Sequence, residues 1–419
     1  MSDSNLLIEP LPPGWKNHQF GDACDRVKDS YQPVDDGDTP YVGLEHLAQG
    51  FPAFVGRGKE CEVKSSKTAF KVGDILFGKL RPYLRKGAQA DFDGVCSTDI
   101  LAFRAKATCE SEFLKFIIHS DEFVSHAKST TSGVQHPRTS WPSLREFRLS
   151  LPPLPEQKKI AHILSTVQRA IEAQERIIQT TTELKKALMH KLFTEGLRNE
   201  PQKQTEIGLV PESWRVVKLG ALFEKQPQNG IYKHKRAYGS GTQILRIDDF
   251  SNDGDVVTRT GNLVALTRSE IETYGLEPGD IVINRVNSLS HLAKTALIGE
   301  IAEEMVFESN MMRFSVDESQ VLKEYLFKFL NSPLTKKQII GTAKRAVAQS
   351  SINQGDVRSI IVPKPSLEEQ REIVAALDAT DSKIAHSTDK AAVLQDLFRT
   401  LLHELMTAKT RVHEVDNLP

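Results

Sequence analysis

The chain lacks long apolar runs. Its longest uninterrupted run, residues 373–377, is far shorter than the ~18 residues that a membrane-spanning helix needs. Residues 1–12 include acidic side chains where a secretory signal peptide would carry a basic stretch. We therefore expect a cytoplasmic protein with no membrane partner.

Cysteine is scarce, and no metal-binding pattern is present. The four cysteines, Cys24, Cys61, Cys96 and Cys109, include no CxxC pair, so neither a zinc site nor a disulfide framework is indicated. We expect them to be buried, reduced thiols. None of the 12 histidines has metal-ligand spacing. The sequence therefore predicts neither a metal nor a cofactor.

Catalytic motifs are also missing. The chain has no G-x-x-x-x-G-K-[ST] phosphate loop, so no ATP-driven activity is expected from it. It has no [DNS]-P-P-[YFW] tetrapeptide, on whose aromatic ring an adenine methyltransferase stacks a flipped base. The Pro-Pro pairs at residues 12–13 and 152–153 have the wrong neighbours. We therefore expect a chain that is not an enzyme by itself.

A basic excess, which is common in dedicated nucleic-acid binders, is absent: 54 basic and 55 acidic residues leave a net charge of −1. Basic residues nevertheless lie in four stretches without a single acid, two in each half of the chain. These stretches are residues 79–86, 123–145, 225–247 and 325–355. One such stretch alone usually indicates only a solvated surface. Four of them predict basic loops on a neutral scaffold.

The strongest feature that is present is an internal repeat. Leu151-Pro-Pro-Leu-Pro-Glu-Gln157 is matched by Val362-Pro-Lys-Pro-Ser-Leu-Glu-Glu-Gln370, and the offset of 213 residues persists through the segments that follow. Upstream, Pro12-Pro-Gly-Trp15 matches Pro211-Glu-Ser-Trp214, and residues 73–77 match residues 279–283. Two copies of one unit therefore make up nearly the whole chain.

Each copy is predicted to be a mixed α/β (α+β) domain followed by one long helix. Residues 73–77 and 279–283 indicate a turn that leads into a buried strand, and residues 113–120 and 325–332 indicate short amphipathic helices. Ser366 and Glu369 form a capping box. We predict a first domain at 1–153, a first long helix at 154–196, a linker at 197–209, a second domain at 210–365, a second long helix at 366–409 and a tail at 410–419.

An apolar stripe along each long helix predicts a coiled coil. At ~1.5 Å per residue, such a helix is longer than a small domain is wide. A helix that packed only on its own domain is the alternative, but it would leave much of its stripe facing water. Two copies sharing one interface imply pseudo-twofold symmetry, and hence antiparallel helices. The predicted seam consists of Ile160, Leu164, Val167, Ile171, Ile178, Leu184, Leu188 and Leu192 in the first helix and Ile373, Leu377, Ile384, Leu394, Leu397, Leu401 and Leu405 in the second.

Two similar domains held apart by a rigid spacer suit two separated sites on one long ligand. Duplex DNA fits, because its half-sites repeat with the helical turn of ~34 Å. Basic side chains would contact its phosphates, and Arg, Asn and Gln would contact base edges. The two copies repeat their frame but not their basic loops, so the two half-sites should differ. The candidate DNA-binding residues are Lys79, Arg81, Tyr83, Arg85, Lys86 and Arg138 in the first copy, and Gln228, Asn229, Tyr232, Lys233, Lys235, Arg236, Arg285, Asn287, Lys344, Arg345, Gln349 and Ser350 in the second.

The repeated motifs resemble those of the specificity (S) subunits of type I restriction-modification systems. The resemblance rests on the P-x-P-x-x-E-Q-x-x-I pattern at residues 363–373, its variant at residues 151–157, and the segments at residues 188–196 and 205–214. It implies two α/β target recognition domains, each reading half of a split, asymmetric DNA target, with the paired helices as a ruler. It also implies partners, namely methyltransferase (M) subunits and restriction (R) subunits that contain the nuclease and translocase.

One departure limits the resemblance: the first copy has a single glutamate before its glutamine where the second copy has two, Glu368-Glu369-Gln370, so no function is carried onto these positions. Base-reading residues vary among family members, so the resemblance does not identify them here. Two alternatives stay open. One is the specificity subunit of a two-component type II (IIB/IIG-like) system, and the other is a coiled-coil scaffold that binds no DNA.

Overall fold

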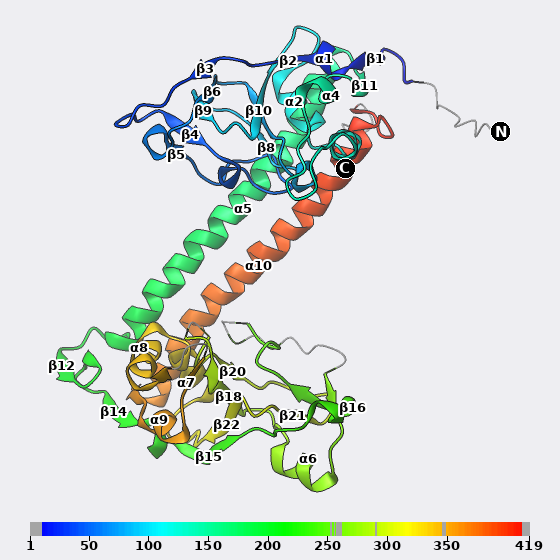
Figure 1. The fold of residues 1–419 in the computed structure, drawn as a ribbon. Helices are drawn as coiled ribbons and strands as arrows, with labels where there is room; N and C mark the ends of the chain where they lie inside the picture. The colour runs from blue at the N-terminus through cyan, green and yellow to red at the C-terminus, as the bar shows by residue number, and fades with distance from the viewer. Residues whose placement is uncertain are drawn as a thin grey trace. The chain divides into compact units, whose positions relative to one another are not determined.

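The computed structural model describes residues 11–251, 254, 256, 262–289, 291–345 and 349–412, without the side chains of Lys344 and Arg345. The chain divides into two compact units. Unit 1 combines the residues up to Arg176 with those from Thr388 onward, and unit 2 is Ile177–Ser387. Each unit contains one α/β domain and parts of both long helices (Figure 1). None of the helices in the described residues is long and apolar enough to span a membrane.

Domain 1, the globular part of unit 1, contains a four-stranded sheet in the order β2-β10-β7-β8 and a five-stranded sheet in the order β3-β6-β9-β4-β5. An antiparallel pair, β1 and β11, links its first strand to its last. The strands are β1 Lys16–Gln19, β2 Cys24–Arg26, β3 Ser30–Tyr31, β4 Pro40–Val42, β5 Gly58–Lys59, β6 Lys67–Phe70, β7 Ile75–Gly78, β8 Gly87–Gln89, β9 Gly94–Cys96, β10 Ile100–Ala105 and β11 Arg148–Leu151. The helices are α1 Phe20–Ala23, α2 Ser111–Ile117, α3 Asp121–Ser129, α4 Trp141–Leu144 and the long α5 Leu154–Thr194, with short 3-10 turns at η1 Leu44–His46, η2 Glu60–Glu62 and η3 Pro82–Leu84.

Domain 2, in unit 2, repeats this plan. Its four-stranded sheet, β15-β22-β18-β20, has the strand order of the four-stranded sheet of domain 1, and β14 pairs with β25 as β1 pairs with β11. The strands are β12 Gln202–Thr205, β13 Gly208–Pro211, β14 Arg215–Lys218, β15 Phe223–Asn229, β16 Tyr238–Leu245, β17 Leu263–Val264, β18 Ile281–Asn284, β19 Val286–Asn287, β20 Thr295–Leu297, β21 Met305–Phe307, β22 Met311–Val316, β23 Lys344–Arg345, β24 Ser350–Ser351 and β25 Ile361–Lys364. The helices are α6 Arg268–Tyr274, α7 Lys323–Leu330, α8 Pro333–Thr342, α9 Gln354–Ser359 and the long α10 Leu367–Met406, with 3-10 turns at η4 Leu219–Ala221 and η5 Lys235–Ala237.

The predicted turns into buried strands are confirmed. Gly73 (φ +88°) and Gly279 (φ +93°) adopt the left-handed conformation that glycine tolerates best, and the buried strands β7 and β18 follow them. The adjacent Asp74 and Asp280 are each 2% exposed and close the turn by accepting a main-chain N–H at 2.8 Å. The two predicted amphipathic helices form as α2 and α7.

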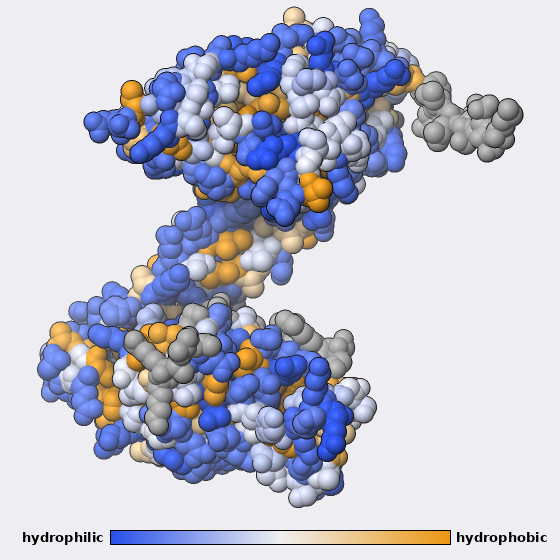
Figure 2. Space-filling model, in the orientation of Figure 1, coloured by the Kyte–Doolittle hydropathy of each residue, from blue (hydrophilic) through white to orange (hydrophobic). Residues whose placement is uncertain are grey.

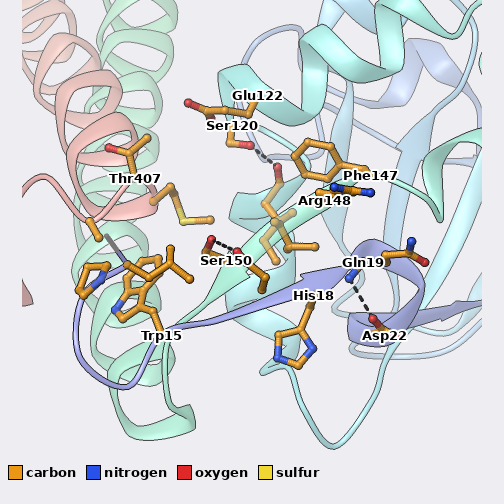
Figure 3. Close-up of a pocket in the computed structure, with 17 residues that line it drawn as sticks. Trp15, His18, Gln19, Asp22, Ser120, Glu122, Phe147, Arg148, Ser150 and Thr407 are labelled. Atoms are coloured by element: carbon orange, nitrogen blue, oxygen red, sulfur yellow. Dashed lines mark hydrogen bonds between the residues drawn. The ribbon is translucent and has the colours of Figure 1, made fainter. Parts of the chain in front are cut away.

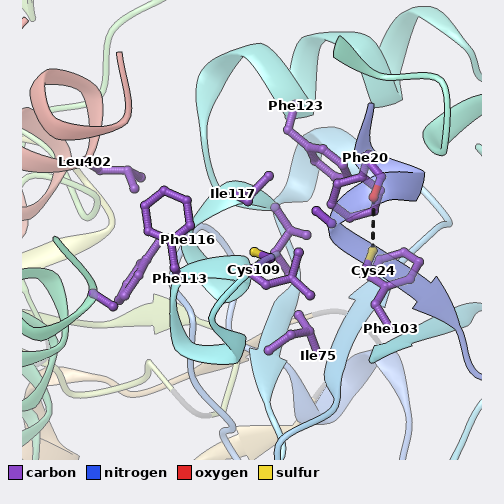
Figure 4. Close-up of a cluster of buried hydrophobic side chains, with 14 of the residues drawn as sticks. Phe20, Cys24, Ile75, Phe103, Cys109, Phe113, Phe116, Ile117, Phe123 and Leu402 are labelled. Atoms are coloured by element: carbon purple, nitrogen blue, oxygen red, sulfur yellow. Dashed lines mark hydrogen bonds between the residues drawn. The ribbon is translucent and has the colours of Figure 1, made fainter. Parts of the chain in front are cut away.

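Aromatic side chains fill the core of domain 1. Phe20 packs on Phe103 and Phe123, with ring centroids 5.2 Å and 4.8 Å away (Figure 4). The same core cluster contains Phe116 of α2 and Leu402 of α10. Domain 1 therefore packs against the end of the second long helix as well as the start of the first.

The cysteines are free thiols, and three of the four are buried. Burial raises the pKa of Cys24 well above its usual value, and it raises the pKa of Cys96 and of Cys109 to about 12. These three thiols therefore stay protonated at neutral pH. Cys61, which the sequence also placed inside, is exposed.

The two long helices pair in an antiparallel sense. In unit 1 the start of α5 and the end of α10 share one apolar core, to which α10 contributes Phe398, Leu402 and Leu405. In unit 2 the end of α5 shares a core with the start of α10, and Lys185 Nζ lies 2.5 Å from Asp381 Oδ1. The alternative, in which each helix packs only on its own domain, is therefore wrong.

Two of the predicted seam residues face solvent. Leu184 is 58% exposed and Leu397 is 43% exposed. Near the end of α10 the buried stripe runs instead through Ala391, Phe398 and Leu402. Phe398 takes the inner position because its ring packs 5.4 Å from Phe51 and 6.0 Å from Phe116 of domain 1. The face of α10 that carries Phe398 therefore points toward the core, and Leu397 points toward solvent.

The segment predicted as a linker, residues 197–209, is partly a sheet. After α5 ends at Thr194, the chain forms an antiparallel pair of β12 with β13. Gly196, with φ +66°, makes this exit possible. A Cβ atom there would lie 2.7 Å from Glu369 Oε1 and 2.8 Å from a ring carbon of Trp214. The close approach of these three residues therefore requires glycine.

A carboxylate in the first turn of each long helix holds the first tryptophan of the same domain. Trp15 Nε1 donates to Glu156 Oε2 at 3.3 Å, and Trp214 Nε1 donates to Glu369 Oε2 at 3.0 Å. The two glutamates occupy equivalent positions in the repeat, so the first copy keeps the glutamate that makes the contact. The residue it lacks corresponds to Glu368, which is exposed.

The next residue, a glutamine in both copies, ties the helix to its domain. Gln157 and Gln370 each donate to the carbonyl of the proline five residues before them, at 2.9 Å and 3.0 Å. Each also accepts the main-chain N–H of the residue that precedes a short helix, Glu110 before α2 at 2.9 Å and Leu322 before α7 at 2.8 Å. The Glu-Gln motif is therefore a structural joint.

This joint predicts different effects for two adjacent glutamates. Glu369 is 3% exposed and accepts hydrogen bonds from Trp214 and from the Leu197 main-chain N–H, so Glu369→Ala should lower the free energy of unfolding by about 3 kcal/mol. The control is Glu368→Ala, which should change it by less than about 0.5 kcal/mol because the side chain is exposed. Urea unfolding followed by tryptophan fluorescence measures both, and equal effects would contradict this role for Glu369.

Candidate nucleic-acid interface

The first basic loop of domain 1 connects β7 to β8 and has an unusual backbone. Arg81 and Arg85 flank the 3-10 turn η3 with φ angles of +50° and +49°. Non-glycine residues adopt this left-handed conformation at a cost, and such residues are often found at functional sites. The loop is therefore held in one defined shape.

Two of its basic residues are used to hold that shape. Arg85 donates to the His119 carbonyl at 3.1 Å and pairs with Asp121. Lys86 Nζ donates to the Leu44 carbonyl at 2.6 Å. Both candidate residues thus have partners within domain 1, and their first role is to anchor the loop.

A hairpin closed by Ser132 and Arg138 lies beside this loop. Ser132 and Arg138 exchange two main-chain hydrogen bonds, at 2.9 Å and 3.0 Å. The Arg81 N–H donates to the Pro137 carbonyl at 2.8 Å, and the Thr139 N–H donates to the Lys79 carbonyl at 3.1 Å. The two basic stretches of domain 1, residues 79–86 and 123–145, therefore lie side by side.

The charge of Arg138 is neutralised within the domain. Its guanidinium donates to both carboxylate oxygens of Asp99, at 2.8 Å and 3.2 Å. These hydrogen bonds hold the pKa of Asp99 below its usual value, and the pKa of Arg138 is raised in turn. Arg138 therefore clamps the base of the hairpin.

The exposed part of this surface includes Arg81, Tyr83, the hairpin tip and the Arg138 side chain. Tyr83 is 48% exposed, and Val134 in the tip is 100% exposed. Gln135 and His136 are also exposed. The sequence predicted a basic loop at residues 123–145, which contains the tip, but only Arg138 was a candidate in it. Val134 and Gln135 were missed because they carry no charge.

Domain 2 has the same arrangement at the end of β18. The Ile352 N–H donates to the Arg285 carbonyl at 2.9 Å, as Thr139 does to Lys79 in domain 1. The segment after Arg285 forms β19, which pairs with the hairpin strands β24 and β23. Arg285 therefore occupies the place of Lys79, and the hairpin between β23 and β24 occupies the place of the hairpin in domain 1.

A turn at residues 308–311, which the sequence did not indicate, joins two of the predicted loops of domain 2. The Gly230 N–H donates to the Met311 carbonyl at 3.0 Å, and the Ser309 N–H donates to the Ile231 carbonyl at 2.9 Å. Arg285 Nη1 donates to the Ser309 carbonyl at 3.1 Å. The segments around residues 229–232 and 285–287 therefore meet on this turn.

Several candidates of domain 2 have partners inside the domain. Gln228 accepts from Arg313 at 2.5 Å and donates to the Thr273 carbonyl at 3.1 Å. Lys233 Nζ lies 2.6 Å from Glu270 Oε1, and this ion pair lowers the pKa of Glu270. These contacts position the loops.

The remaining candidates differ in exposure. Ser350 is 6% exposed and lies in β24, so it does not present its side chain for base reading. Asn287 is partly exposed, and its side-chain oxygen accepts the Ser288 N–H at 2.8 Å. Tyr232 is 80% exposed. Asn229, Lys235, Arg236 and Gln349 are exposed as well, and the side chains of Lys344 and Arg345 lie outside the described part.

A separate groove of about 610 Å³ lies in unit 1 between the β1–β11 pair, the start of α3 and the end of α10 (Figure 3). Trp15, His18, Ser120, Phe147 and Thr407 are among its lining residues. None of the candidate DNA-binding residues lines it, so it is not part of the candidate interface. In the described part of the chain, no group of three or more His, Cys, Asp or Glu side chains is placed to hold a metal ion.

Comparisons with known proteins agree with the two-copy plan. The model of a family described as type I restriction modification DNA specificity domain matches residues 12–182 and 211–395. The type I restriction enzyme MjaVIII specificity subunit of Methanocaldococcus jannaschii is 27% identical over 97% of this chain and 95% of its own length. The EcoKI specificity subunit of Escherichia coli strain K12 is 25% identical over 64% of this chain and 58% of its own length.

Solved structures share the fold. A chain from a study of assembly and conformational transition of the type I R-M system has a TM-score of 0.58 at 21% identity, covering 95% of this chain and 98% of that chain. The type I restriction-modification S subunit from M. genitalium has a TM-score of 0.57 at 15% identity, covering 94% of this chain and 96% of that chain. Because the family model matches both copies of the repeat and most of the chain, this protein belongs to the type I restriction-modification DNA specificity family.

Proposed function

We propose that this chain reads a split, asymmetric DNA target for a type I restriction-modification complex, one half-site with each domain. The supporting observation is that the two domains hold their basic loops with equivalent hydrogen bonds but differ in what the loops present. Arg81 in domain 1 corresponds to Asn287 in domain 2, and Arg138 corresponds to Ser351. Because the side chains at equivalent positions of the two domains differ, the two domains should recognise different base pairs.

The paired helices act as the ruler that sets the gap between the half-sites. Each helix begins at a Glu-Gln joint that ties its first turn to its domain. In each unit the core also takes in the end of the other long helix. The length of the helices therefore sets the separation of the two reading surfaces. Because its substrate is cellular DNA, we place the protein in the cytoplasm.

Methyltransferase subunits are the partners that would carry out the chemistry, and restriction subunits would join them for cleavage. We assign methyltransferase docking to the helix faces that carry the exposed Leu184 and Leu397. These leucines are equivalent in the repeat, and Val393, one turn before Leu397, is 67% exposed. Figure 2 shows apolar side chains on the outer surface of the helices. Two equivalent apolar faces suit two copies of one partner.

The direct test is co-expression of this chain with the neighbouring methyltransferase gene, followed by single-molecule sequencing of modified adenine. The expected result is a motif with two different half-sites and a fixed gap. A continuous motif, or no sequence-specific modification from an active methyltransferase complex, would overturn the proposal.

Phosphate contact by Arg81 predicts a change in the salt dependence of binding. Arg81→Gln should weaken binding to every DNA sequence and lower the slope of log K against log salt by about 0.9, the value for one phosphate contact in duplex DNA. The control is the double variant Lys59→Gln/Asp38→Asn, which removes an exposed ion pair of domain 1 outside both basic loops and should leave the slope unchanged. Fluorescence anisotropy of labelled duplexes at several salt concentrations measures both slopes. An unchanged slope for Arg81→Gln would remove this residue from the interface.

Docking on the exposed leucines predicts a loss of assembly without a loss of fold. Leu184→Glu and Leu397→Glu should each weaken recruitment of one methyltransferase subunit by more than tenfold, because a charge would be buried in an apolar contact. Thermal unfolding of the chain should stay nearly unchanged, since both side chains already face solvent. Exposed Val72, which is 62% exposed and lies in domain 1, supplies the control Val72→Glu. Native mass spectrometry counts the bound subunits, and full occupancy in both leucine variants would place the docking site elsewhere.

A further inference from the structure

The hairpin of domain 1 combines a fixed base with a fully exposed tip. Its base is held by the Ser132–Arg138 main-chain pair, by the bidentate contact of Arg138 with Asp99, and by the Arg81 N–H bond to Pro137. At the tip, Gly133 has φ +90°, which lets the chain reverse. A rigid base with a projecting tip is the form that a reading element needs, because a side chain must reach the bases from a defined position.

The tip carries side chains that a plain turn does not need. Exposed turns favour Gly, Asn, Asp and Ser, whereas this tip carries Val134 and Gln135. Val134 is 100% exposed, while every other large hydrophobic residue in the described chain is at most 80% exposed. A single exposed apolar side chain is not unusual by itself. Here it lies next to an exposed amide, on a hairpin held against a basic loop.

Val134 and Gln135 together match one base pair. In the major groove, adenine presents N7 as an acceptor and its N6 amino group as a donor, and a glutamine amide can bind both. The partner thymine presents its C5-methyl group, which contacts small apolar side chains. An apolar residue followed by glutamine is therefore complementary to an A·T pair, whereas a G·C pair offers no methyl group.

We propose that the tip of this hairpin enters the major groove and reads an A·T base pair in the half-site of domain 1. Gln135 binds the adenine edge, and Val134 packs on the thymine methyl group. Arg81, whose main chain is bonded to the hairpin, contacts the neighbouring phosphate. This assignment rests on the proposed function, because it names the base pair that one part of that interface reads.

The equivalent hairpin of domain 2 explains why the reading would be confined to one half-site. It occupies the same place, but its closing pair is Lys344 with Ser351, so it is one residue longer than the hairpin closed by Ser132 and Arg138. The two hairpins therefore differ in length, and the assignment made for domain 1 is not carried over to domain 2.

The first test uses the full chain in complex with its methyltransferase partner and a set of duplexes in which each target base pair is varied. Gln135→Ala should reduce the preference for A·T by about 10- to 100-fold at one position of one half-site, and leave every other position unchanged. Gln135→Glu should change that preference toward C·G, because a carboxylate accepts from the cytosine amino group. Val72→Ala, at an exposed valine three residues before β7, is the control and should change nothing.

The second test isolates the methyl contact. Replacing the proposed thymine by deoxyuridine removes only the methyl group, and it should weaken binding of the wild-type chain several-fold but not that of Val134→Ser, whose side chain is polar. Preferences of Gln135→Ala and Gln135→Glu that equal those of the wild type, or a uniform loss of affinity in both, would overturn the assignment of the tip. So would equal sensitivity of Val134→Ser and the wild type to deoxyuridine. Failure of the proposed function is distinguishable, because the wild-type complex would then show no preference at any position.

Discussion

A hydrogen-bonded carboxylate in the first turn of each long helix, buried in the case of Glu369 and partly buried in the case of Glu156, is the contact on which the architecture depends. Glu156 and Glu369 each accept the indole N–H of the first tryptophan of their domain, and the glutamine that follows binds the turn before the helix. Removing a carboxylate from water is costly unless its hydrogen bonds are made, so these contacts favour the geometry in which both carboxylates keep their partners. Each helix therefore leaves its domain in a fixed direction.

Each of these two joints also contacts the segment that follows the other long helix. Glu156 also receives the guanidinium of Arg411, at 2.9 Å and 3.1 Å, from the segment just after α10. In unit 2, Glu369 receives the Leu197 N–H from the segment just after α5. Each joint thus binds the start of one long helix and the exit of the other, and the two helices are registered at both of their ends.

Repetition and divergence divide the molecule into a repeated frame and loops that differ between the two copies. Individual hydrogen bonds of the frame recur in both copies. For example, the Thr139 N–H donates to the Lys79 carbonyl in domain 1, and the Ile352 N–H donates to the Arg285 carbonyl in domain 2. The loops supported by this frame differ in side chain and in length. A specificity protein needs this division, because its reading surface must change while its spacing stays constant. Arg138, a predicted DNA-binding residue, also holds the base of its hairpin through its contact with Asp99.

The sequence by itself determined the repeat, the two domains, the two long helices and the family, because periodic apolar positions and the spacing of Trp, Pro, Glu and Gln are local patterns. It did not determine which basic residues are neutralised, because the contact of Arg138 with Asp99 joins positions 39 residues apart. The sequence also predicted Leu184 and Leu397 in the seam, although both face solvent. A periodic apolar stripe does not determine which of two neighbouring positions, such as Leu397 and Phe398, points inward. The rotation of α10 about its axis depends on tertiary packing, because the Phe398 ring packs against Phe51 and Phe116 of domain 1.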